Sequence, residues 1–540
     1  MNTRIEQLIN EEENKRGQLG NWQAYRQDVV SFVLPRKAWI TTVKVSGARL
    51  NDDFLYDSRA NLALKEAACG FHSKLTNPAQ RWFESRTQNE KKMQSGHVQR
   101  YFKEVDDIQF DVLRATNFDP TLIEFYTDDL SVGVATILTE EDHKKHVRYS
   151  SIPIEQICWE LDDRGELCKI YRTFKWTAWK CQQRWGSKIT HDMKKAIEEE
   201  KGQTKFEIMH YVGPRDVRNA SKKDNVNMEW ESLWIAKKEK VELGTSGFVD
   251  MPYDLTRFWV HADDDDGGYS PAMDVLAAIK TVNAQARTIV RSGQKSVDPG
   301  YMMPSRFWIA PLNGNPSAMN YYDASRFKAD QFARLPAGEN PKLGIELMAV
   351  QQELIDRGFF LPLFRALSDV HKQMTVPEVQ QRIAEGLGLI GPVVGRMTNT
   401  IQSVLLRTYG ILDRRLLFPP PPKEIQGEEL AISFNSPLAK AQRQSELQGT
   451  QAWVQFLLQM SEAMPSVLDG VDGDRVRNVS RDLLGVDPTM ERDEEDIKTI
   501  RSDRAKAQKQ QQQLAMAQAA GSAAADVSKA HLNTKQAGKV

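Results

Sequence analysis

The strongest constraint on the fold is a long apolar repeat in the second half of the chain, MTVPEVQQRIAEGLGLIGPVVGRMTNTIQSVLLRTYGIL (374–412). Apolar side chains recur there at steps of three or four residues, which is the spacing of one helical face. The members of this stripe are Val379, Ile383, Leu387, Ile390, Val394, Met397, Ile401 and Leu405.

Helix-breaking residues interrupt this repeat without ending it. Gly391 and Pro392 lie in its middle, yet the stripe keeps its phase on both sides of them. Proline removes one backbone hydrogen bond and bends a helix without changing its apolar face. Thr375 and Glu378 have the spacing of a capping box. The pattern therefore predicts one long kinked helix at about 377–412.

Two further helices flank a segment of different composition. Ser270 is a good N-cap and Pro271 suits the first helical position, so a helix is expected from there to about Gly293. Helical periodicity returns in GIELMAVQQELIDRG (344–358). The segment between them is rich in Pro, Gly, Asn and aromatic residues. These features predict two paired helices with an elaborated tip.

Strand-like patterns precede these helices, over about 125–260. Ile157, Trp159 and Leu161 alternate before a turn at Asp162–Gly165, and several further β-rich runs follow without βαβ alternation. An antiparallel sheet is expected here. The predicted fold class is therefore α+β, mainly helical.

Charge and composition narrow the function classes. Among 540 residues, 72 Lys and Arg balance 73 Asp and Glu, which argues against a basic surface that grips DNA tightly. No apolar run approaches the length of a membrane span, so no membrane partner is expected. The four cysteines Cys69, Cys158, Cys168 and Cys181 form no CxxC pair, which favours free thiols over a zinc site.

An acidic run, Asp263–Asp266, precedes the helix that begins at Ser270. A metal-dependent nuclease or phosphatase would need these carboxylates to converge on metal ions. Consecutive loop residues point in different directions, so a solvated loop is favoured. Motifs for nucleotide binding or nucleophilic catalysis are absent from the sequence. We expect no enzyme activity, no catalytic residue, no metal and no cofactor.

In order and spacing, several segments resemble bacteriophage portal proteins, the head-to-tail connecting family of short-tailed, T7-like phages. The resemblance extends from about Trp22 to Gln442. Its segments are YDSRANLALKEAACGFHSKLTNPAQRWF, SSIPIEQICWELDDRGELCKIYRTF, GGYSPAMDVLAAIKTVNAQA, MTVPEVQQRIAEG followed by GPVVGRM, and FNSPLAKAQR.

The resemblance implies the portal fold and divides the chain into named regions. These are a wing (1–268), a first stem helix (269–295), a clip (296–342), a second stem helix (343–365), a tunnel loop (366–376), a kinked wing helix and return (377–435), a crown (436–492) and a Gln/Ala-rich tail, helical or disordered (493–540).

The resemblance also implies a dodecameric ring at one capsid vertex of the virion, assembled in the host cytoplasm. Its channel would pass double-stranded DNA during packaging and ejection, and it would meet terminase, tail adaptors, the major capsid protein and scaffolding proteins. We expect non-specific DNA contacts from His371, Lys372, Lys280, Arg287 and Arg291, and stem packing between subunits from Met273, Leu276, Ile279, Ala286 and Ile289. A non-viral oligomeric scaffold is the other alternative.

Overall fold

The computed structural model places its residues in two compact units, which are Met1–Trp82 with Asp111–Arg414 and Ser436–Gln442, and Phe83–Phe110 with Arg415–Asn435 and Arg443–Val540. The residues that the structure describes are 2–42, 52–93, 95–219, 221–222, 224–260, 267–297, 301–302, 325, 333–334, 341–368, 376–428, 430–434, 449–460, 471–473, 475–477, 480, 497 and 499–513.

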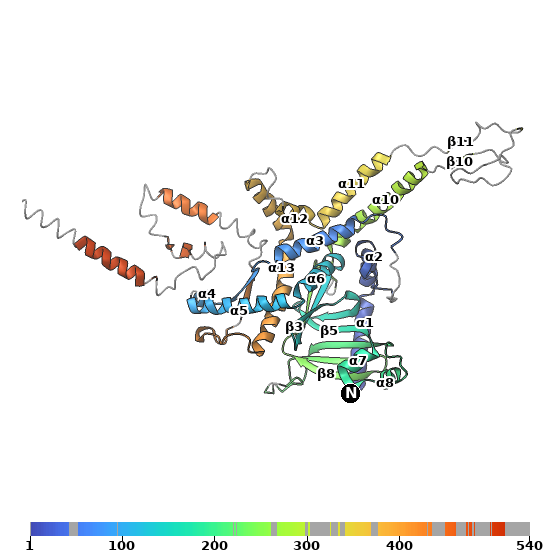
Figure 1. Cartoon of the computed structure of the whole chain (residues 1–540), viewed down its shortest axis with the longest axis horizontal. Helices are drawn as coiled ribbons and strands as arrows, with labels where there is room; N and C mark the ends of the chain where they lie inside the picture. The colour runs from blue at the N-terminus through green and yellow to red at the C-terminus, as the bar shows by residue number, and fades with distance from the viewer. Residues whose placement is uncertain are drawn as a thin grey trace, which may run out of the picture. The chain divides into compact units, whose positions relative to one another are not determined.

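The first unit is rich in helices (Figure 1). They are α1 (Asn2–Gln18), α2 (Gly20–Val33), α3 (Arg59–Leu75), α6 (Phe118–Val132), α7 (Ala178–Trp185), α8 (His191–Glu198), α9 (Pro271–Asp274), α10 (Leu276–Val297), α11 (Pro341–Gly358), α12 (Leu361–Ser368) and α13 (Val376–Arg414). Short 3-10 turns lie at Pro35–Lys37, Ile154–Gln156 and Gly186–Lys188.

Helix α13 confirms the long helix that the apolar repeat predicts, because it runs without a break through Gly391 and Pro392. Its apolar stripe is buried wherever its side chains are described, at Val394, Met397, Ile401 and Leu405. The side chains of the four earlier members lie outside the described residues, and the kink at Pro392 stays a prediction.

Two antiparallel sheets confirm the expected α+β region. The larger has the strand order β4-β5-β6-β7-β8, and the smaller has the order β3-β2-β9. The strands are β2 (Val134–Asp142), β3 (His146–Ser151), β4 (Ile157–Leu161), β5 (Leu167–Thr177), β6 (Lys205–Pro214), β7 (Trp230–Ala236), β8 (Val241–Phe248) and β9 (Tyr253–Arg257).

The larger sheet owes its stability to a dense aromatic core under α7 and α8. Trp176, Trp185 and Trp234 pack against one another there, with ring centroids 5.6–6.2 Å apart. Threonine hydroxyls cap both helices: Thr177 accepts from the backbone of Lys180, and Thr190 from that of Met193. The local helix caps and the packing of the core therefore favour the same structure in this region.

The start of the α9–α10 segment confirms the expected cap, but the helix is interrupted. The Ser270 hydroxyl accepts from the backbone of Met273, and Pro271 occupies the first helical position. The interruption falls at Val275, between α9 and α10. A Cβ added at Gly358 of α11 would collide with the Val275 side chain, so the two backbones approach closely at this point.

The second helix of the expected pair is divided as well. Helix α11 ends at Gly358, and a separate helix, α12, begins at Leu361. Of the two residues between them, Phe360 has a φ of 59°, a left-handed conformation that a helix cannot contain. The segment predicted to form a second stem helix (343–365) therefore contains two helices, and the chain changes direction between them at Phe360.

In the second unit, β1 (Phe83–Thr87) pairs antiparallel with β12 (Leu430–Phe434). Helix α4 (Glu90–Met93) and the first part of α5 (Gly96–Ala115) follow β1, and a 3-10 turn lies at Lys423–Ile425. The described residues at 449–460 and 499–513 are helical. The helix at 449–460 exposes Trp453 and Phe456.

Several sequence-based expectations lie outside the described residues. Asp263–Asp266, His371 and Lys372 belong to this group. Of the segment expected to form the clip, the described part includes β10 (Tyr301–Met302), paired with β11 (Ala333–Arg334).

Candidate assembly and channel site on α10 and α11

Polar contacts fix the start of α10 to the segment before α3 and to α2. The Asn283 side chain donates to the carbonyl of Phe54 at 2.9 Å and accepts from the backbone of Tyr56 at 2.7 Å. Lys280 donates to Asp28 of α2 at 2.5 Å. Lys280, one of the cations expected to contact DNA, is therefore engaged within the chain.

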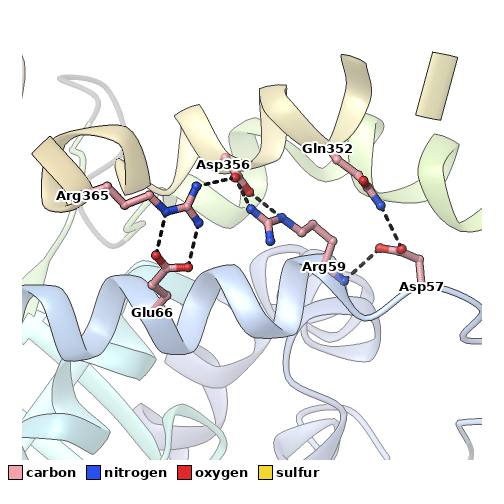
Figure 2. Close-up of polar contacts among 6 residues, drawn as sticks. All are labelled: Asp57, Arg59, Glu66, Gln352, Asp356 and Arg365. Carbon is pink, nitrogen blue, oxygen red and sulfur yellow. Dashed lines mark hydrogen bonds and ion pairs between the residues drawn. The ribbon is translucent and has the colours of Figure 1, made fainter. Parts of the chain in front are cut away.

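Figure 2 shows a second set of polar contacts, in which α3 binds both α11 and α12. The Asp356 carboxylate of α11 accepts from Arg59 of α3 and, at 3.1 Å, from Arg365 of α12. Arg365 also donates two bonds to Glu66 of α3, at 2.9 and 2.8 Å. Planar, bidentate pairs of this kind are the stronger class of charge-assisted bond.

The apolar residues that we expected between subunits are mostly covered by the chain itself. Met273, Leu276, Ile279 and Ala286 are buried in a single copy. Ile289 is half-buried, and a Cβ at Gly344 of α11 would lie 3.4 Å from it. These side chains hold α9, α10 and α11 together, so little of their surface is left for a neighbouring copy. Their role between subunits stays a prediction.

A different apolar set on the same two helices is exposed. Leu347, Val350 and Leu354 follow one face of α11 at helical spacing. Val290 of α10 and Ile345 of α11 are also exposed, and all five side chains keep 44–57% of their surface accessible. These residues were not predicted from the sequence. The available signal was that α11 has apolar residues on two faces, since Ile355 is buried on the other.

The cations expected to contact DNA differ in their surroundings. Arg287 is exposed, and its guanidinium lies 5.7 Å from the ring centroid of Tyr56. Arg291, one turn further along α10, is also exposed. Lys280 is paired with Asp28, as described above. Because paired charges release fewer counterions, Arg287 and Arg291 are better placed than Lys280 for phosphate contacts.

Buried ionisable groups lie elsewhere in the first unit and have structural roles. Burial lowers the pKa of His210 well below its ordinary value, and this neutral ring contacts the Tyr253 hydroxyl at 2.7 Å and the Ser232 hydroxyl at 2.9 Å. Burial likewise raises the pKa of Asp254 to about 6 and that of Asp129 well above its ordinary value. The residues that the structure describes contain no cluster of three or more His, Cys, Asp or Glu side chains suited to a metal ion.

The four cysteines are free thiols, with Cys158 and Cys181 buried and Cys69 exposed. Within the described ranges, no helix is both long and apolar enough to cross a membrane.

Comparison with known proteins now defines the class. The model of the family described as bacteriophage head to tail connecting protein matches residues 3–490, so the chain belongs to that family. The chain is 25% identical over 536 residues to the portal protein of Salmonella phage epsilon15, covering 98% of this chain and 96% of that protein. It is 24% identical over 493 residues to the probable portal protein of Bordetella phage BPP-1, covering 90% and 89%.

These similarities bear out the resemblance that the sequence segments suggested, and they support the portal interpretation. They give no support to a metal-dependent nuclease or phosphatase that uses Asp263–Asp266.

Proposed function

We propose that this chain is the portal of a bacteriophage. Copies of it form a closed, dodecameric ring at one vertex of the capsid, and DNA passes through the ring during packaging and ejection. The observation that carries this proposal is the family match over residues 3–490, together with two paired helices that leave apolar side chains exposed.

The exposed apolar face of α10 and α11 supports assembly with copies of the same chain. Five exposed valine, leucine and isoleucine side chains on two adjacent helices are unfavourable in water, and burial at an interface removes that cost. A ring places one face of each copy against a different face of the next. We assign Leu347, Val350 and Leu354, which share one face of α11, and Val290 of α10 to this contact.

We assign the regions of the chain to portal parts as follows. The residues up to 268 form the wing, α10 and α11 form the stem, and 296–342 form the clip, where terminase and later the tail adaptors bind. The segment between α12 and α13 serves as the tunnel loop, α13 is the long wing helix, and 436–492 form the crown, which faces capsid and scaffolding proteins.

The channel would act passively on DNA. A chain with a formal net charge of −1 offers no general basic surface, so a duplex is not held in place by the phosphate backbone and remains free to slide. Arg287 and Arg291 provide weak non-specific contacts. In this proposal the protein has a structural role, and the packaging motor supplies the energy that moves the DNA.

Imaging and mass measurement of the purified protein test this function. We expect annular particles in electron microscopy and a native mass that is a multiple of the 61.5 kDa chain. A non-viral scaffold would give other assemblies and would not enter phage capsids. A structural portal has no hydrolase activity, so hydrolysis of DNA that disappears when Asp263–Asp266 are changed to Asn would favour the nuclease alternative.

A further inference from the structure

The corner between α11 and α12 combines a strained backbone with close packing on two sides. Phe360 adopts a left-handed φ of 59°, which is unfavourable for an L-residue with a large side chain. On one side, Gly358 lies against Val275; on the other, a Cβ at Gly70 of α3 would come within 2.8 Å of the Phe364 ring. Conformations of this kind persist where the surroundings hold them, and they are enriched at switch regions.

Ion pairs hold the exposed side of the same corner. Arg365 is the residue that joins all three helices, because it bonds Glu66 on α3 and Asp356 on α11 from its place on α12. Hydrogen bonding to Glu66, and then to Asp356, raises the pKa of Arg365 above its ordinary value and outweighs burial, which lowers it. The guanidinium therefore remains charged at every pH at which the protein folds.

We propose that the α11–α12 corner is a latched hinge. Arg365 is the latch that keeps α12 against α3, and Phe360 is the strained pivot whose relaxation favours release. Relaxation of Phe360 to a helical φ would turn α12 toward the direction of α11. It would also remove the Phe364 ring from its close contact with Gly70 of α3. The buried rings of Phe359 and Phe364 oppose this movement, so the closed corner predominates while the latch is intact.

The biological meaning of the hinge rests on the proposed portal function, because residues 369–375 connect α12 to α13. A change in the direction of α12 alters where the chain enters that connection. The physical claim is independent of any ring, since every contact that it uses lies within one copy.

Hydrogen exchange of the full-length protein tests the latch. Helix α12 has only eight residues, so its backbone bonds, including the one from Leu363 to the carbonyl of Phe360, should open more often once α12 is released from α3. We expect Arg365→Gln to raise exchange in peptides that span residues 357–364 by about tenfold, while peptides from β5, β6 and β7 are unchanged. Glu66→Gln, which removes the same bidentate pair from the other side, is expected to give the same result.

Arg357→Gln is the matched control. Arg357 is on α11 beside the corner, and its ion pair with Glu353 lies within that one exposed helix. We expect wild-type exchange in this variant. Equal exchange in Arg365→Gln, Glu66→Gln and the wild type would overturn the latch.

The pivot is tested by comparing Phe360→Ala with Phe360→Gly. Both variants lose the ring, but only glycine accepts the left-handed φ without cost and is disfavoured in a continuous helix. We expect the alanine variant to exchange about fivefold to thirtyfold faster at the corner than the glycine variant. Identical exchange in the two variants would show that no backbone strain favours opening. Because neither measurement requires a ring, a hinge that fails and a portal function that fails give separate results.

Discussion

The five-stranded sheet and the α10–α11 pair bury their apolar side chains in different ways. Under α7 and α8, the side chains of the sheet are covered within one copy, including Ile208 and Trp234. On α11, Leu347, Val350 and Leu354 remain exposed although they follow helical spacing. The first region buries its apolar surface within a single chain. The second leaves apolar surface exposed, as expected of an element that packs against a neighbouring copy.

This difference predicts which changes break the assembly and which break the fold. The largest effect is expected from charges on the exposed face of α11. We predict that Leu347→Asp combined with Val350→Asp eliminates annular particles while the circular dichroism spectrum stays unchanged, because a carboxylate buried at an interface without a partner is strongly unfavourable. Native mass spectrometry and electron microscopy measure the outcome.

Val217→Asp provides the control for this experiment. It places the same charge at a position that is 89% exposed, outside α10 and α11. We expect rings at the wild-type level. Rings that persist in the double variant of α11 would contradict the assignment of this face.

The next effect concerns the interior of the sheet. Trp159 is fully buried, so Trp159→Ala is expected to lower the free energy of unfolding by about 3–5 kcal/mol. Trp179 on α7 is 57% exposed, and Trp179→Ala should change it by less than about 0.5 kcal/mol. Chemical denaturation followed by the fluorescence of the remaining tryptophans distinguishes the two. Equal losses would mean that the sheet is not a self-contained core.

Acid should weaken the sheet region before the helix pair. The folded state depresses the pKa of His210, so below about pH 6.5 the unfolded state binds the proton more readily and stability falls as pH falls. Each pH unit below that point costs up to about 1.4 kcal/mol until the folded pKa is reached. We predict that the melting temperature of His210→Gln changes less between pH 7.5 and pH 5 than that of the wild type. The exposed His143, changed to Gln, should leave the wild-type dependence intact.

The smallest effect is expected from single cations on α10. Arg291→Gln should reduce the slope of log affinity against log salt for non-specific duplex DNA by about one. Lys280→Gln should change it less, because Asp28 already neutralises Lys280. A slope that falls more for Lys280 than for Arg291 would show that the pairing seen in one chain does not persist in the assembly.

Helix caps and long apolar repeats were predictable because they depend on neighbours in sequence. Ser270 with Pro271, and the stripe through Met397 and Ile401, therefore appear where they were expected. What covers an apolar face was not predictable. The spacing of Met273 and Leu276 shows that α9 and α10 have an apolar side, but not that the same chain buries it.

The corner at Phe360 also has no signal in the sequence. A phenylalanine in a left-handed conformation contradicts local preference, and it is held there by contacts with residues far away along the chain. The pair of Glu66 with Arg365 links positions 299 residues apart, and such pairs cannot be read from periodicity.

The most direct test of the account is a cryo-electron microscopy reconstruction of the assembled wild-type protein. The account predicts a closed ring in which Leu347, Val350 and Leu354 of each copy are buried against the adjacent copy. A ring that leaves these three side chains facing solvent, or a protein that stays monomeric alone and in the presence of capsid components, would contradict it.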